Sequence, residues 1–148
     1  MIGGEVLRAA ARDQPAAQLA SIGQGLSLMP MTEALLDYVA DGGDDGVPGF
    51  WRLPGGFAKT LAEWSTAGPV AYAEAEYFGG VGEQTAVVRD AGAIVLGPLH
   101  EPEGAPSPPT GSPISRALRR LSAVAGTGED EFTAVGLGRH RSVEGWVA

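Results

Sequence analysis

The sequence has 148 residues, no cysteine and a formal net charge of −8. The lack of cysteine excludes disulfide bonds, thiolate zinc sites and cysteine nucleophiles, and no run approaches the roughly 20 apolar residues of a membrane-spanning helix. The first 110 residues carry 14 acidic and 5 basic side chains, so their charge repels phosphate and disfavours binding to nucleic acid and to membranes.

The length and the hydrophobic fraction of 44% fit one globular domain over residues 1–148. The amino-terminal stretch lacks the apolar core of a signal peptide, so we expect a cytoplasmic protein. A helical segment is predicted over residues 1–22. Pro15 interrupts this helix, and Asp13 is a plausible N-cap for the helical turn that contains Pro15 and continues after it. The whole segment can fray.

A short strand and two helices are predicted next. The strand covers residues 25–30, and the first helix begins at Thr32 as N-cap and ends at Gly42. Residues 41–56 form a turn-rich loop around "FWRL", whose aromatic pair is expected to pack onto the core. The second helix covers residues 57–66, with apolar side chains recurring on one face.

From Val70 the hydrophobic period changes to two, which predicts an antiparallel meander with strands at 70–78, 84–89 and 93–97. In "VAYAEAEYF" the alternation places Glu74 and Glu76 on one side of the strand and the alanines on the other. Small alanines let a helix pack closely, so we expect both glutamates on the more open side.

A proline-rich connector is predicted over residues 101–112, followed by a helix with Ser112 as N-cap and by a final strand over 131–137. The expected fold is a single α+β domain, in which an antiparallel sheet of four to five strands carries helices mainly on one face. The core is expected to include Trp51, Trp64, Phe57, Leu36, Leu35, Leu118, Leu121 and Val88.

Glu74 and Glu76 are the first candidates for chemistry, because carboxylates at i and i+2 of a strand project from one face about 7 Å apart. That spacing suits an acid/base pair or a metal site, and it equally suits a solvated or partner-facing acidic patch. His140 in "GLGRHR" could complete a catalytic cluster with them. Arg139 and Arg141 could bind an anion or pair with the acidic face.

Motifs that would identify an enzyme are lacking. "GGVGEQ" links two strands instead of opening a helix, so it is not a phosphate-binding loop. "DGGDDG" misses the spacing of a calcium loop. Two histidines are too few for a typical zinc site unless carboxylates complete it. We therefore expect no metal and no cofactor.

The runs "AYAEAEYFGGVGEQTAVV" and "DEFTAVGLGRHRSVEGW" resemble small acidic bacterial proteins, some of which are thought of as immunity-type proteins. Such proteins neutralise toxins of polymorphic or contact-dependent systems. The resemblance implies an α+β fold that binds a toxin and has no activity of its own. It assigns no role to any single residue.

The sequence favours a non-enzymatic interaction protein that binds a cationic protein partner through an acidic surface. Carboxylates would speed association, and Tyr72 or Phe78 would supply apolar anchors. The expected contact residues are Asp44, Asp45, Tyr72, Glu74, Glu76, Phe78 and Glu83. Two alternatives stay open: a small hydrolase or lyase using Glu74, Glu76 and His140, and a homodimer formed through an exposed strand.

Overall fold

The computed structural model describes residues 1–40, 46–78, 81–106 and 108–147, with the backbone alone at 77, 78 and 81. Within these ranges the chain forms one antiparallel sheet of six strands in the order β2-β3-β1-β4-β5-β6, together with five α-helices. The strands are β1 (Ile2–Gly3), β2 (Ala20–Ser21), β3 (Ser27–Leu28), β4 (Val70–Phe78), β5 (Val81–Asp90) and β6 (Ala93–Glu101). The α-helices are α1 (Glu5–Asp13), α2 (Glu33–Val39), α3 (Gly55–Trp64), α4 (Pro113–Arg120) and α5 (Glu131–Ala134). The described residues also form three short 3-10 helices, η1 (Ser65–Ala67), η2 (Leu137–Arg139) and η3 (Glu144–Trp146). The fold is therefore α+β, as expected.

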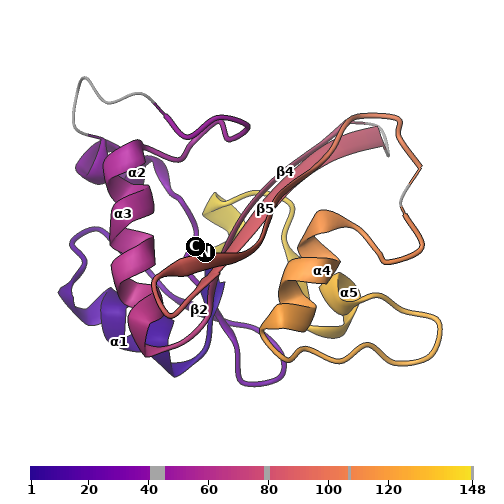
Figure 1. Ribbon diagram of the computed structural model, residues 1–148, viewed down its shortest axis with the longest axis horizontal. Helices are drawn as coiled ribbons and strands as arrows, with labels where there is room; N and C mark the ends of the chain where they lie inside the picture. Colours follow the sequence, from indigo (N-terminus) through magenta and orange to yellow (C-terminus); the bar gives the residue numbers. More distant parts are fainter. Residues whose placement is uncertain (41–45, 79–80, 107, 148) are drawn as a thin grey trace.

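Helices cover both faces of the sheet. Figure 1 shows α1, α2 and α3 on one side of β4 and β5, and α4 and α5 on the other. Alternate residues of β4 enter two separate hydrophobic clusters: Val70 and Tyr72 pack with α1–α3, whereas Ala71 packs with α4. The structure thus does not confirm the expected arrangement with helices mainly on one face.

The alanine side of β4 receives a closely packed helix, as the sequence predicted. Ala71 and Ala86 of the sheet and Ala117 of α4 are almost fully buried in one cluster. Helix α4 begins where its signals predicted, because the Ser112 side chain accepts a hydrogen bond from the backbone N–H of Ser115 and Pro113 occupies the first turn.

Two terminal segments differ from the sequence-based prediction. The strand predicted over 131–137 is wrong: residues 131–134 form helix α5, and the Asp130 side chain caps it by accepting the N–H of Thr133. At the start of the chain, β1 and β2 flank α1, and residues 16–22 contain strand β2 instead of the predicted continuation of the helix. The Met1 amine is buried and donates a hydrogen bond to Met29 O at 2.8 Å. A strand of two residues is too short to show the alternation of apolar and polar side chains that predicts a strand. For this reason β1 and β2 were not predicted, and the sheet has more strands than the expected four to five.

Most of the expected core is observed, with one exception. The buried members of the expected set are Phe57, Leu35, Leu118, Leu121 and Val88, and Trp64 and Leu36 pack partly buried against the first cluster. Trp51 was expected in the core, and this is wrong, because 51% of it is exposed.

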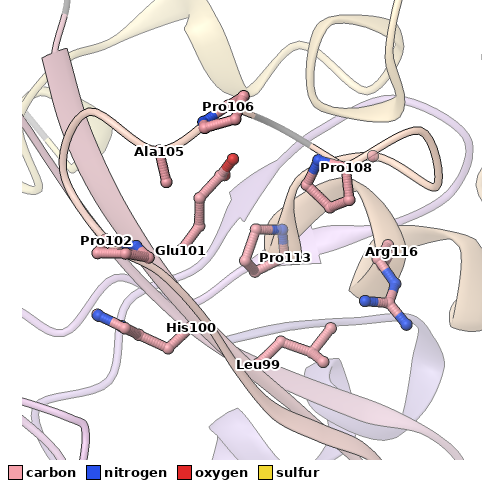
Figure 2. A pocket seen from close by; sticks show the side chains of 10 residues that line it. Leu99, His100, Glu101, Pro102, Ala105, Pro106, Pro108, Pro113 and Arg116 are labelled. Atoms are coloured by element: carbon pink, nitrogen blue, oxygen red, sulfur yellow. The ribbon is translucent and has the colours of Figure 1, made fainter.

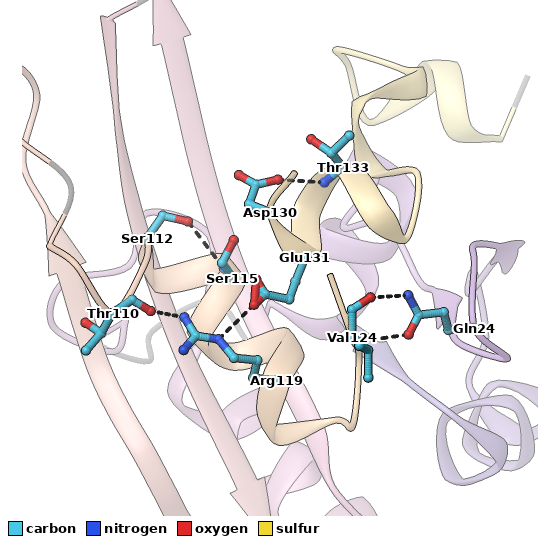
Figure 3. A network of polar contacts seen from close by, with 9 residues as sticks. All are labelled: Gln24, Thr110, Ser112, Ser115, Arg119, Val124, Asp130, Glu131 and Thr133. Carbon is cyan, nitrogen blue, oxygen red and sulfur yellow. Dashed lines mark hydrogen bonds and ion pairs between the residues drawn. The ribbon is translucent and has the colours of Figure 1, made fainter. Parts of the chain in front are cut away.

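A polar network joins α4, α5 and the connector (Figure 3). Arg119 pairs with Glu131 at 2.9 Å and donates to the carbonyl of Thr110. The Gln24 side chain makes two hydrogen bonds, both of 2.8 Å, with the backbone of Val124. The Gln24–Val124 hydrogen bonds thus tie together two segments that lie 100 residues apart in the sequence. Throughout the described ranges, the helices are too short or too polar to cross a bilayer.

Candidate functional site

Three carboxylates of the central strands lie on the side of the sheet that faces α1–α3. Glu74 and Glu76 belong to β4, and Glu83 belongs to β5. The register pairs Glu74 with Thr85 and Glu76 with Glu83, so all of them share one side with Tyr72. We call the side chains of Glu74, Glu76 and Glu83 the acidic face.

Glu74 holds a loop of its own chain. Its two carboxylate oxygens accept the backbone N–H groups of Trp51 at 2.6 Å and Arg52 at 2.7 Å. The Tyr72 hydroxyl lies 3.0 Å from Oε2. Glu74 is half-buried, and hydrogen bonds to an ionised group are among the stronger ones in proteins. This glutamate therefore supports the loop at residues 46–54 rather than standing free on an open side.

Tyr72 is not an exposed anchor, contrary to the expectation, because only 2% of it is exposed. Its ring packs edge-on against Phe50, and its hydroxyl lies 2.7 Å from the carbonyl oxygen of Arg52. Burial, and secondarily the charge of Glu74, raise the pKa of the Tyr72 phenol. The phenol consequently stays protonated, and the side chain packs in the interior of the protein.

Trp51 is an exposed aromatic residue beside the acidic face. Its neighbours Phe50 and Leu53 are buried and fix the loop to the first hydrophobic cluster, while the Trp51 indole remains outside. Arg52, beside it, pairs with Glu33 at the start of α2. The sequence pointed to the aromatic pair, but it gave no signal for which of the two rings faces the solvent.

The remaining carboxylates of the acidic face are accessible. Glu76 is exposed, and the Glu83 side chain is 33% exposed. His100 of β6 lies opposite Thr85, with Nδ1 2.9 Å from Thr85 Oγ1 and Nε2 3.6 Å from Glu83 Oε2. Sequence reasoning missed His100. The third strand of the meander was predicted to end at residue 97, whereas β6 continues to Glu101 and so includes His100.

The three residues proposed for catalysis are not brought together by any contact among the described residues. His140 stacks edge-on against Trp146 at 4.8 Å between ring centroids. It follows η2, whose Leu137 is buried in the second cluster, on the side of the sheet opposite Glu74. The histidine near the acidic face is His100 instead.

The two arginines proposed for anion binding have different surroundings. Arg139 donates to the carbonyl oxygens of Ser21 at 2.7 Å and Gly136 at 3.1 Å, and its guanidinium lies over the Trp146 ring. Arg141 is exposed. Of the other expected contact residues, Asp44, Asp45 and the Phe78 side chain lie outside the described residues.

Beneath the acidic face lies the buried amino terminus. Burial lowers the pKa of the Met1 amine from 8.0 to about 5, and the charge of Glu74 opposes this shift.

In the described ranges no group of three or more His, Asp or Glu side chains is arranged to hold a metal ion. Comparison with protein-family models, curated proteins and solved structures finds no match for this chain.

Proposed function

We propose that this chain is a non-enzymatic interaction protein that binds a cationic protein through Trp51, Glu76 and Glu83. The observation that carries the proposal is the exposed indole on a loop whose backbone is fixed at 2.6 Å by Glu74. Tryptophan is enriched among the residues that dominate binding energy. A loop that is already ordered loses little entropy when it binds.

The charge of the chain supports a cationic partner. The net charge is −8, and Glu76 and Glu83 add local negative charge on accessible positions. Complementary charge speeds encounter and discriminates against wrong partners. Neutralisation of a cationic toxin in the cytoplasm, as an immunity-type protein, is the form of this function that the sequence resemblance implies.

The roles within the acidic face are divided. Glu76 and Glu83 are assigned to contact with the partner, and Glu74 to holding the loop. Charge reversal at Glu74 would release the loop as well as alter the charge, so it cannot test binding by itself. The decisive variant is therefore Glu76→Lys combined with Glu83→Lys.

The experiment uses the proteins encoded by the genes that flank the one for this chain. Each is purified, and its binding to this chain is measured by biolayer interferometry at low and high salt. We expect a basic protein to bind, with affinity that falls as salt rises, and the double variant to lose that binding. The matched control is Glu63→Lys with Glu144→Lys, which changes the net charge equally at exposed positions elsewhere.

Two results would contradict the proposal. One is the absence of binding by every flanking gene product. The other is binding that both double variants weaken equally, since that would reflect overall charge rather than this surface.

If the bound protein arrests the growth of a bacterial host, coexpression of this chain should restore growth.

One observation favours a second candidate function, a small hydrolase or lyase. His100 and Glu83 form an imidazole–carboxylate pair on the acidic face, which is the arrangement of a general base and its partner. Nδ1 of His100 faces Thr85, which is nearly fully buried, so a substrate would have to meet this pair at the exposed edge where Nε2 and the Glu83 carboxylate face each other. Turnover of chromogenic esters or glycosides that disappears in His100→Asn would favour this function, and its absence favours binding alone.

A further inference from the structure

A cavity of about 270 Å³ lies between the end of β6, the proline-rich connector and the start of α4 (Figure 2). It lies on the side of the sheet opposite the acidic face, because Leu99 pairs with Ala86 of the second cluster. Its wall is largely apolar and includes Leu99, Pro102, Ala105, Pro106, Pro108 and Pro113.

Two oppositely charged side chains line this cavity without pairing with each other. Glu101 extends from β6 toward Ala105 and Pro106, and Arg116 lies on the other side of Pro113 (Figure 2). Within the described part of the chain, Glu101 Oε1 is buried and has no hydrogen-bond partner. Arg116 is half-buried as a residue, and its guanidinium has neither a hydrogen bond nor an ion pair to any described residue.

This arrangement differs from that of the neighbouring arginine. Arg119, one turn along α4, pairs with Glu131 and with a backbone carbonyl. Burial of a polar atom without a partner is costly, and most buried polar atoms in folded proteins are hydrogen-bonded. This cost falls on the Glu101 oxygen. A buried carboxylate oxygen without a partner, at the same cavity as a guanidinium without one, points to a ligand that supplies both partners.

We propose that the cavity binds a small zwitterion, namely an apolar amino acid or dipeptide. The ligand's ammonium group would donate to Glu101, its carboxylate would accept from the Arg116 guanidinium, and its apolar part would pack against the prolines. A guanidinium suits a carboxylate because it can donate two parallel hydrogen bonds. The volume lies just below the range typical of drug-sized ligands, which suits a smaller molecule. This site is independent of the proposed partner surface.

The test is a titration of the full-length protein, followed by two-dimensional amide NMR, with L-leucine and glycyl-L-leucine as probes. L-Leucinamide, which lacks the carboxylate, and 4-methylpentanoate, which lacks the ammonium group, serve as comparison ligands. We expect saturable shifts around residues 99–102 and 111–116 with at least one zwitterion. Each comparison ligand should bind about tenfold more weakly than leucine, because it lacks one charged hydrogen bond.

Variants assign the two charges separately. Glu101→Gln should lower the affinity for the zwitterion about tenfold and remove the preference for it over 4-methylpentanoate. Arg116→Gln should likewise lower the affinity for the zwitterion about tenfold and remove the preference for it over L-leucinamide. The matched controls, Glu103→Gln and Arg120→Gln, make the same charge changes at exposed neighbouring positions, and they should leave binding unchanged.

Several outcomes would overturn the proposal. The first is the absence of saturable shifts with either zwitterion at about 50 mM, far above the millimolar range expected for so few heavy atoms. Equal binding of leucine and both comparison ligands would show that the charged groups play no part. Unchanged affinity in both Glu101→Gln and Arg116→Gln would place the ligand elsewhere. The wild-type ligand series decides the question even if a variant fails to fold.

Discussion

The backbone N–H of Trp51 donates to the carboxylate of Glu74 at 2.6 Å, which joins an exposed indole to a central strand of the sheet. Arg52 donates to the other carboxylate oxygen at 2.7 Å. A side chain that the alternation of β4 placed on an open surface thus orders the loop above it. In the proposed function, the binding role therefore passes to the indole that this carboxylate supports.

Glu74→Gln should destabilise the fold by about 2 kcal/mol or more. An amide keeps the shape of the side chain but loses its charge, and it places an NH₂ group or a neutral oxygen where two N–H donors need acceptors. The loop carries Phe50 and Leu53 into the core, so its release should lower the free energy of unfolding. Urea denaturation measures the change.

The control is Glu76→Gln, two residues along the same strand. Glu76 is exposed, and substitutions at such positions usually change stability by less than about 0.5 kcal/mol. If both variants lost the same stability, Glu74 would have no special structural role.

Trp51→Ala should weaken binding to the cationic partner by at least about 2 kcal/mol, or roughly thirtyfold in Kd, while leaving the fold intact. The indole is half exposed and contributes little to the core. Val124→Ala, at another exposed apolar position, should leave binding unchanged. Calorimetry with the partner, together with a urea curve for each variant, separates the two effects. Loss of stability in Trp51→Ala would mean that the ring stabilises the fold instead of binding the partner.

Stability should rise with pH between about pH 5 and pH 8 in protein made with Met1 as its free amino terminus. Burial lowers the pKa of the Met1 amine from 8.0 to about 5, so between these values the unfolded chain binds a proton that the folded chain does not. The free energy of unfolding should increase by up to about 1.4 kcal/mol per pH unit. The added stability is complete above pH 8 and is lost as the pH falls to 5.

Urea denaturation across this pH range tests the slope. A variant with a short amino-terminal extension carries its charged amine outside the core, so it should be less stable but should lose the slope. An equal slope in both proteins would assign the pH dependence to other groups.

Arg119→Gln should destabilise the protein by about 1–2 kcal/mol, because it leaves the mostly buried Glu131 carboxylate without its cation and the Thr110 carbonyl without a donor. Arg119 itself is 44% exposed, which limits the effect through solvent screening. Arg120→Gln, at the next and exposed position, is the control and should be neutral. Glu131→Gln added to Arg119→Gln should recover part of the loss in a double-mutant cycle.

Gly97→Ala should cost more than about 3 kcal/mol, whereas Gly104→Ala should cost about 1 kcal/mol. Both glycines have positive φ, +86° and +79°, so the backbone penalty is similar. A Cβ at Gly97 would lie 2.6 Å from Ala86 O and 2.7 Å from Leu99 N, whereas a Cβ at Gly104 meets nothing within 4 Å. Thermal unfolding of the pair would isolate the steric contribution, and equal losses would refute it.

Local signals in the sequence predicted the elements that depend on neighbouring residues. Thr32 and Ser112 cap their helices as expected, each accepting the N–H three residues on. The period of two in 70–78 gave β4 with its observed bounds. Asp130 is an equally clear cap for α5, but the apolar residues after it also fit a strand, and there the strand prediction is wrong.

The candidate site could not be predicted in the same way, because it depends on contacts between distant residues. Alternation indicates that Glu74 and Glu76 share a side, but not that a loop more than twenty residues earlier covers one of them. The burial of Tyr72 and the exposure of Trp51 follow from that same loop. His100 joins the acidic face only through the register of β5 with β6.

The two edge strands of the sheet limit how far strands of another molecule can pair with it. Strand β6 forms one edge and contains Pro98, which has no N–H to offer a neighbouring strand. Strand β2 forms the other edge with only two residues. A second copy could still pair with β6 along a run such as Ala93–Leu96, but Pro98 limits its length and β2 offers only two residues, so repeated addition into fibres is disfavoured. The short and proline-interrupted edges therefore work against self-association as the concentration of the protein rises.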